Sequence, residues 1–224
     1  MSAAAEPVSR RDRPAKSPLT RRSILDAATA LIRERGVDSV SLRAVAEQVQ
    51  TGPASLYAYF ANRDVLLENV LDEAYQRVEL PAVRDGDWRG ALASTIANTV
   101  DVLGEYPGLG SVALGSIPTL PGALRIADHE LDLMARGGIA PARAALAVDV
   151  IAQFVAATAT ERTMRSVPFG PEERTRLHGI YQAADPDRFP HVVAAADALT
   201  APSERARRDF AIEVIIAGLA SARA

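Results

Sequence analysis

The sequence predicts an all-α protein, made of an N-terminal domain of three short helices and a larger helical body. Alanine occupies 43 of the 224 positions, and alanine has the highest intrinsic helix propensity. Apolar residues recur at helical spacing along most of the chain. No segment shows the convincing alternation of apolar and polar residues that is typical of a half-buried strand. The apolar fraction of 48% is large enough to bury a hydrophobic core.

The N-terminal part begins with an arm and continues into short helices. Residues 1–19 are polar and contain three prolines and a cluster of four basic residues, which is typical of a flexible segment. Thr20 is a good N-cap residue for the first helix, and Gly36 ends it. Ser41 caps a second helix, and Pro53 suits the first position of a third. The helices expected after the first are 42–49, 53–59 and one that begins near residue 62.

The body is expected to contain six longer helices. Between turn signals, apolar residues at helical spacing predict helices over 88–105, 121–136, 141–165, 171–183, 189–199 and 203–223. The breaks are expected at Pro81, 85–87, 106–118, 137–138 and 166–170. The chain therefore divides into a flexible arm (1–19), a three-helix domain that we call the head (20–66), and the body (67–224).

Composition excludes several classes of protein. The chain has no Cys, which excludes a disulfide scaffold, thiol catalysis and metal sites built on cysteine. The longest apolar stretch, 144–159, is shorter than the roughly 20 residues that a membrane span needs. The first residues lack the apolar core of a secretory signal. We therefore expect a cytoplasmic protein with no membrane partner.

The charge distribution points to a polyanion as the partner of the N-terminal part. Residues 1–63 carry 10 basic and 6 acidic residues, a formal charge of +4. Residues 64–224 carry 15 basic and 22 acidic residues, a formal charge of −7, and the sum is the −3 of the whole chain. A basic head on an acidic body suggests that the head meets nucleic acid. Chance and a solvated tail would give the same split, so charge alone does not decide.

A helix-turn-helix is expected between residues 42 and 59. Two short helices flank the turn Gln50-Thr51-Gly52. Ala46 is small where the two helices must approach closely, and Gly52 is expected to supply a backbone conformation that most residues resist. The residues expected to close the small core are Leu25, Leu31, Val45, Val49, Leu56 and Leu66.

The second helix of this motif would leave small and amphipathic side chains outside. Small residues allow close approach to base edges in a major groove, and the hydroxyls of Tyr57 and Tyr59 can donate to phosphates. Arg63 begins the next helix, whose N-terminal amides favour an anion. An ordinary three-helix packing unit has the same outline, but the exposed tyrosine pair and the basic arm argue against it. The pattern therefore favours DNA binding.

The segment LTRRSILDAATALIRERGVDSVSLRAVAEQVQTGPASLYAYFANRDVLLENVLDEAY closely resembles the DNA-binding domain of the TetR family of bacterial transcriptional regulators. Its distinctive parts are SLRAVA (41–46), LYAYF (56–60) and NRDVL (62–66). The resemblance implies a regulator, usually a repressor, that binds a palindromic DNA operator as a homodimer and is released by a small-molecule inducer.

The resemblance also assigns roles at matching positions. The residues that would face bases are Arg43, Thr51, Pro53, Ala54 and Ser55, with Gly52 in the turn beside them. The residues that would hold phosphates are Ser41, Tyr57, Tyr59 and Arg63. Arg63 stands where the family usually has Lys, and Tyr59 replaces a common His. Ala58 stands where a large aromatic residue or His is frequent, so one backbone contact is expected to be missing. The alternative for Arg43 is that it is an ordinary solvated side chain without a contact to DNA.

The body resembles the tetracycline-repressor class. Residues 106–118 are similar to the segment around that repressor's metal-binding histidine, whose position is Ala113 here, and Glu161 falls near the acidic residue of the same metal site. Because the histidine is missing, we expect no metal, no cofactor and no magnesium–tetracycline site. The helices at 141–165 and 203–223 resemble the dimer-forming helices, which implies a homodimer. A core helix within a monomer is the alternative for 141–165.

An inducer pocket is expected among helices 88–165, mostly apolar and with a few polar groups. Its candidate residues are Asn98, His129, Gln153, Phe154, Thr158 and Glu161. For each of them, a core or surface role is at least as good an interpretation. The identity of the inducer does not follow from the sequence.

Two other functions are less consistent with the sequence. Residues 108–113 match the dinucleotide motif GxGxxA, but no strand precedes them, so the match fails its own structural context. No GxSxG or HExxH motif is present, and an enzyme is not expected. A helical protein that merely sequesters a small molecule would have no use for an exposed aromatic and basic head.

Overall fold

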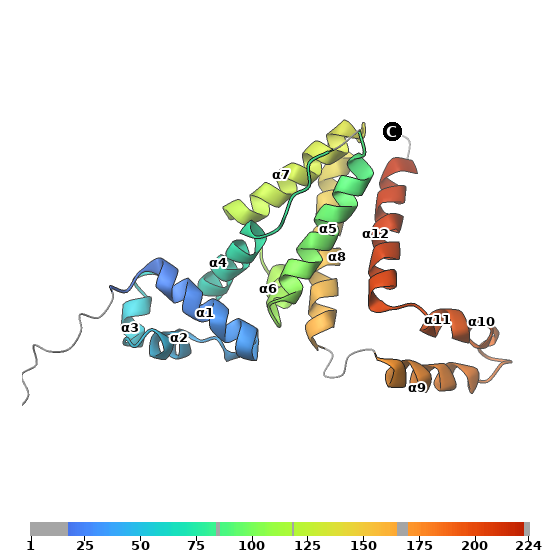
Figure 1. The fold of residues 1–224 in the computed structure, drawn as a ribbon, viewed down its shortest axis with the longest axis horizontal. Coiled ribbons are helices and arrows are strands. Elements are labelled where there is room, and N and C mark those ends of the chain that lie inside the picture. Colours follow the sequence, from blue (N-terminus) through green and yellow to red (C-terminus); the bar gives the residue numbers. More distant parts are fainter. Residues whose placement is uncertain (1–17, 84–85, 118, 165–169, 222–224) are drawn as a thin grey trace, which may run out of the picture.

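The computed structural model describes residues 18–83, 86–117, 119–164 and 170–221, and every regular element in these ranges is a helix (Figure 1). The head and its exit consist of α1 (Arg21–Arg35), the 3-10 turn η2 (Val37–Ser39), α2 (Leu42–Gln48), α3 (Pro53–Leu56) and α4 (Arg63–Gln76). The body consists of α5 (Trp88–Gly104), α6 (Leu109–Gly115), α7 (Pro121–Arg136), α8 (Pro141–Met164), α9 (Pro171–Gln182), α10 (Pro190–Ala194), α11 (Ala196–Thr200) and α12 (Glu204–Ser221). The all-α prediction is confirmed. Most of the expected arm, residues 1–17, lies outside the described residues.

Two expectations for the body are wrong. The break expected at 106–118 contains α6, which begins after Gly108 in a left-handed conformation (φ 86°). Its glycines obscure the helical pattern in the sequence, and Gly110 has a packing role: a Cβ there would lie 2.7 Å from the Ala156 carbonyl oxygen of α8. The helix expected at 189–199 is two short helices, because Ala195 between them departs from the helical conformation (φ −99°, ψ 6°).

Side-chain caps and a small apolar core hold the head together. The Thr20 hydroxyl accepts a hydrogen bond from the Ser23 backbone N–H at 3.0 Å and caps α1. The expected core residues Leu25, Leu31, Val45, Leu56 and Leu66 are buried, whereas Val49 is half-buried. Burial of each large aliphatic side chain contributes roughly 1.5–3 kcal/mol. The head is therefore a packed unit that can hold α3 in a fixed position.

Helix α4 connects the head to the body. It packs on α1 in the head, and on α7 and α6 in the body (Figure 1). The guanidinium of Arg125, on α7, donates to the carbonyl oxygens of Tyr75 at 3.0 Å and Val78 at 2.7 Å, at the C-terminal end of α4. The expected boundary at residue 66 falls inside α4, and the division into 20–66 and 67–224 stays a prediction.

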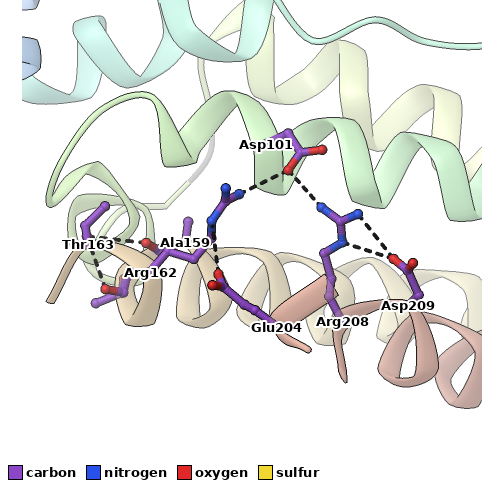
Figure 2. A network of polar contacts seen from close by, with 8 residues as sticks. Asp101, Ala159, Arg162, Thr163, Glu204, Arg208 and Asp209 are labelled. Atoms are coloured by element: carbon purple, nitrogen blue, oxygen red, sulfur yellow. Dashed lines mark hydrogen bonds and ion pairs between the residues drawn. The ribbon is translucent and has the colours of Figure 1, made fainter. Parts of the chain in front are cut away.

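A polar network joins α5, α8 and α12 (Figure 2). The Asp101 carboxylate, on α5, accepts from Arg162 of α8 at 3.0 Å and from Arg208 of α12 at 2.8 Å. Arg162 also pairs with Glu204 at 3.2 Å. Exposed ion pairs contribute little one by one, but these share one carboxylate and the Arg208 side chain is only 13% exposed. The network therefore sets how α12 lies against α5 and α8.

Helix α8 is long and apolar enough to cross a membrane, by length and composition alone. The apolar stretch at 144–159, which is shorter than the helix that contains it, did not indicate this. The core helix of a soluble protein meets the same criterion. Here α8 packs against α5, α6 and α7, with Ile151, Val155 and Ala159 in the hydrophobic core. The packing of the body therefore explains why α8 carries these apolar residues.

Candidate DNA interface and ligand cavity

The turn between α2 and α3 differs from the expected one in which residue takes the left-handed conformation. The Thr51 backbone N–H donates to the Ala46 carbonyl oxygen at 2.8 Å and closes the turn on α2. The left-handed residue is Gln50 (φ 55°), whereas Gly52 is extended (φ −80°, ψ 147°) and is the N-cap of α3. The expectation that Gly52 supplies the unusual conformation is wrong. A Cβ at Gly52 would meet no atom within 4 Å, so folding does not require a glycine there.

Helix α3 presents a row of small side chains to solvent. Pro53, Ala54 and Ser55 are exposed, while Leu56 is buried in the core of the head. Tyr57, just beyond the helix, is 59% exposed. The exposed side chains of α3 are small and uncharged, which suits insertion of this helix into the major groove.

Two further candidate residues lie on α2. The Ser41 hydroxyl accepts from the Ala44 backbone N–H at 3.1 Å and caps this helix. The Arg43 side chain is exposed and pairs with Glu47 one turn later, at 3.1 Å. An exposed i,i+4 pair is weak, so the guanidinium can be drawn to another partner at little cost.

The polar groups of Tyr59 and Arg63 are used within the head. The Tyr59 hydroxyl donates to the Leu19 carbonyl oxygen at 2.8 Å. The Arg63 guanidinium donates to the carbonyl oxygens of Val40 at 2.7 Å and Val37 at 2.9 Å. These two of the four side chains expected to hold phosphates thus fix the start of α1 and the segment before α2. Their contact with DNA stays a prediction.

The body contains a cavity of about 510 Å³. It is lined by α4, by Ala113 and Leu114 of α6, by the α6–α7 connection, by α7 and by α8, and it touches α5 only at Thr99. A pocket was expected among helices 88–165, so the contribution of α4 is new. Most of the lining side chains are apolar, among them Ile126, Val148 and Val155. The volume lies within the range of about 300–1,000 Å³ that is usual for small-molecule sites.

The structure brings one of the six candidate ligand residues, Gln153, to this cavity. Asn98 instead donates to the Glu79 carbonyl oxygen at 2.9 Å. His129 is half-buried beside the Pro81 backbone, and burial lowers the pKa of this imidazole below its ordinary value. Phe154 and Thr158 are half-buried on α8, and Glu161 is exposed there. A ligand role for these five residues has no support from the cavity.

The most unusual group in the cavity wall is the carboxyl group of Glu130, on α7. Glu130 is 3% exposed, and burial raises its pKa to about 8. Tyr75 of α4 also lines the cavity, and its own burial, with the charge of Glu130, raises the pKa of its phenol to about 12. The cavity therefore holds a carboxyl group that is poorly solvated and a phenol that stays neutral.

Sequence reasoning missed Glu130, although a signal was present. Ile126, Leu133 and Met134 are buried on α7, and Glu130 falls with them at the spacing of one helix face. An acidic residue on the apolar face of a helix is rare unless it is paired or functional. The α4 residues that line the cavity carried no such signal, because their position depends on how α4 packs against α7.

Models of two protein families match the chain. Residues 24–70 match the bacterial regulatory proteins of the tetR family, and residues 80–223 match the tetracyclin repressor-like C-terminal domain. The chain belongs to the TetR family. This TetR-family protein is a DNA-binding transcriptional regulator, with a C-terminal domain of the tetracycline-repressor type, as its sequence predicts.

Related proteins support the same assignment. The tetracycline repressor protein class G of Vibrio anguillarum is 26% identical, over 92% of this chain and 96% of that protein. The HTH-type transcriptional repressor DrrR1 of Streptomyces coeruleorubidus is 34% identical over 101 residues, 43% of this chain, and the match spans 37% of that repressor.

Solved structures extend the likeness to almost the whole TetR-family chain. Apo ActR from Streptomyces coelicolor superimposes with a TM-score of 0.84 at 29% identity, covering 92% of this chain and 97% of that one. ActR in complex with actinorhodin gives the same TM-score and identity, covering 92% and 100%. The head and the body therefore have the arrangement of a TetR regulator.

Proposed function

We propose that this protein is a cytoplasmic repressor that binds a palindromic operator as a homodimer and leaves it when a small molecule enters the cavity. The observation that carries the proposal is the double role of α4. This helix packs on α1 of the head and lines the cavity of the body. A ligand that favours another position of α4 would move the head. A coupling of ~1–3 kcal/mol is enough for regulation.

In this proposal α3 enters the major groove. The exposed small residues Pro53, Ala54 and Ser55 approach the base edges, with Thr51 and Gly52 at the entrance to the helix. Arg43 leaves its ion pair with Glu47 and contacts a base or a phosphate instead. The exposed hydroxyl groups of Ser41 and Tyr57 face the DNA backbone. Tyr59 and Arg63 support these contacts by fixing the segments on either side of the motif.

We propose that α8 and α12 form the dimer interface, in agreement with the expected helices 141–165 and 203–223. Both helices expose large apolar side chains, which are Leu146 and Val150 on α8 and Phe210 and Val214 on α12. A continuous apolar face on a soluble protein marks an interface. In a two-fold dimer the same face would be buried on both protomers. The dimer would present two heads to the two halves of a palindrome.

The inducer is proposed by analogy with the relatives. Their names include tetracycline repressors, and one solved structure is ActR in complex with actinorhodin. In this chain Ala113, at the position of the metal-binding histidine, cannot ligate a metal, so the inducer differs from a magnesium–tetracycline complex. Neither a cofactor nor a catalytic activity is part of this function.

Selection of bound fragments from genomic DNA of the source organism by the purified protein tests the function. We expect enrichment of a two-fold-symmetric sequence by the wild-type protein and its loss with Arg43→Ala. Fragments that share no sequence and are retained only at low salt would contradict the proposal, because non-specific binding is mainly electrostatic.

A further inference from the structure

We propose that the cavity binds an organic cation, with an apolar ring system and a protonated amine that pairs with the carboxylate of Glu130. This inference rests on the proposed function, because it gives the chemical class of the inducer. It is carried by the burial of Glu130, by the charges that line the cavity and by the apolar walls around them.

Glu130 is a buried acid without a partner among the described residues. Its side chain is 3% exposed and lines the cavity. No described residue donates a hydrogen bond to its carboxyl group or forms an ion pair with it. An ionised carboxylate in such a place is costly unless a counter-ion is supplied. The carboxyl group of the empty protein therefore holds its proton up to a pKa of about 8, and a bound cation would stabilise the ionised carboxylate.

The other charges of the cavity have the same sign. Its lining includes the acidic residues Glu68, Asp72, Glu130 and Asp149, and the described lining residues include no Lys, Arg or His. The Asp72 carboxylate accepts from the Gly122 backbone N–H at 2.6 Å, and Asp149 accepts from Gln153 at 2.8 Å. Glu68 and Glu130 are left to meet a ligand. An anion would face repulsion from each of these carboxyl groups that is ionised.

The remaining wall of the cavity is mostly apolar. Ile126, Val148 and Val155 provide aliphatic surface around the acids. The ring of Tyr75 belongs to the same wall, and the charge of Glu130 acts on its phenol. A cation beside Glu130 would therefore also lie near an aromatic ring, an arrangement that adds about 0.5–2 kcal/mol when the pair is desolvated.

Calorimetric titration of the full-length protein without DNA tests this inference with three tricyclic probes. These are 9-aminoacridine, a cation at neutral pH, acridine, which is neutral, and acridine-9-carboxylate, an anion. We expect the cation to bind at least tenfold more tightly than the anion or the neutral probe, a difference of about 1.4 kcal/mol. Glu130→Gln should abolish this preference. Asp128→Asn, a matched change at an exposed position of α7, should preserve it.

Several results would overturn the inference: no binding of 9-aminoacridine, equal binding of the three probes, or a cation preference that survives Glu130→Gln. Tighter binding of neutral acridine would also do so, because it would mean that protonated Glu130 donates to a neutral acceptor. Thermal unfolding of each variant shows that it is folded. Selection of a symmetric operator without any cation preference would refute the ligand class alone. Failure to select an operator would refute the proposed function instead.

Discussion

The carboxylate of Asp72, on α4, accepts a hydrogen bond of 2.6 Å from the backbone N–H of Gly122, in the first turn of α7. The first N–H groups of a helix have no partner within it, and a negative charge is favourable there. Asp72 also lines the cavity. This contact therefore joins three features of the regulator: the helix that leads to the head, the helix that carries Glu130, and the cavity.

Gly122→Ala is expected to disturb this junction. A Cβ at position 122 would lie 2.5 Å from the Asp72 carbonyl oxygen and 3.0 Å from the Tyr75 Cβ. Backbone atoms cannot turn aside as a flexible side chain can, so α4 and α7 must separate, at about 1–3 kcal/mol. Chemical denaturation should show this loss, and operator affinity should change with it. Gly179→Ala, on α9, meets no atom within 4 Å and is expected to be neutral or slightly stabilising. Equal stability of the two variants would contradict the account of the junction.

Gln50→Gly is expected to stabilise the head. A left-handed backbone costs a non-glycine residue about 1–2 kcal/mol, and Gln50 has a φ of 55°. Part of the gain is lost to the greater backbone entropy of glycine in the unfolded chain, so we expect a net gain of about 0.5–1 kcal/mol in the free energy of unfolding. The same substitution at Gln48, the last residue of α2, should give no gain and a small loss of stability. A loss of stability at position 50 would show that Gln50 makes a compensating contact.

Glu130→Gln is expected to change how stability depends on pH. Burial raises the pKa of Glu130 to about 8 from an ordinary value of 4.5. Between these two values the folded protein binds a proton that the unfolded chain has lost, so the stability of the wild-type protein falls as the pH rises from 4.5 to 8. Gln does not titrate. The variant should therefore match the wild type near pH 4.5 and exceed it by a few kcal/mol above pH 8. Parallel curves for the two proteins, from urea unfolding at a series of pH values, would contradict the burial of an unpaired carboxyl group.

Leu146→Glu is expected to break the homodimer. Leu146 is exposed on α8 in the single chain, and in the proposed dimer it would be buried against the partner. An unpaired charge there would cost several kcal/mol. Sedimentation velocity should show a dimer for the wild type and a monomer for the variant. Gln182→Glu, at an exposed position of α9, adds the same charge and should remain dimeric. A dimeric Leu146→Glu protein would move the interface away from this part of α8.

Local signals in the sequence were sufficient for most of the fold. The caps Thr20 and Ser41 and the prolines at 53, 121, 141 and 171 mark helix starts that the structure confirms. Helix α6 was missed because Gly110 allows close packing with α8 and does not form a turn. The pattern of residues around Gln50 and Gly52 likewise did not reveal which of the two takes the left-handed conformation.

The candidate site was less predictable than the fold. The exposed residues of α3 could be predicted because the repeat of a helix determines which of its side chains face solvent. The hydrogen bonds of Arg63 to the carbonyl oxygens of Val37 and Val40 join residues more than twenty positions apart. The cavity lies between α4, α6, α7 and α8. Such contacts depend on tertiary packing, which helical spacing within one segment does not define.

The most direct test of the central claim is the affinity of the selected operator for a variant of the α3 surface. Fluorescence anisotropy at constant salt would compare the wild-type protein with Tyr57→Ala and, as a matched control, Tyr181→Ala on α9. We predict that Tyr57→Ala weakens binding at least tenfold, or about 1.4 kcal/mol, and that Tyr181→Ala binds like the wild type. Equal affinities of all three proteins would contradict the assignment of this surface as the one that contacts DNA.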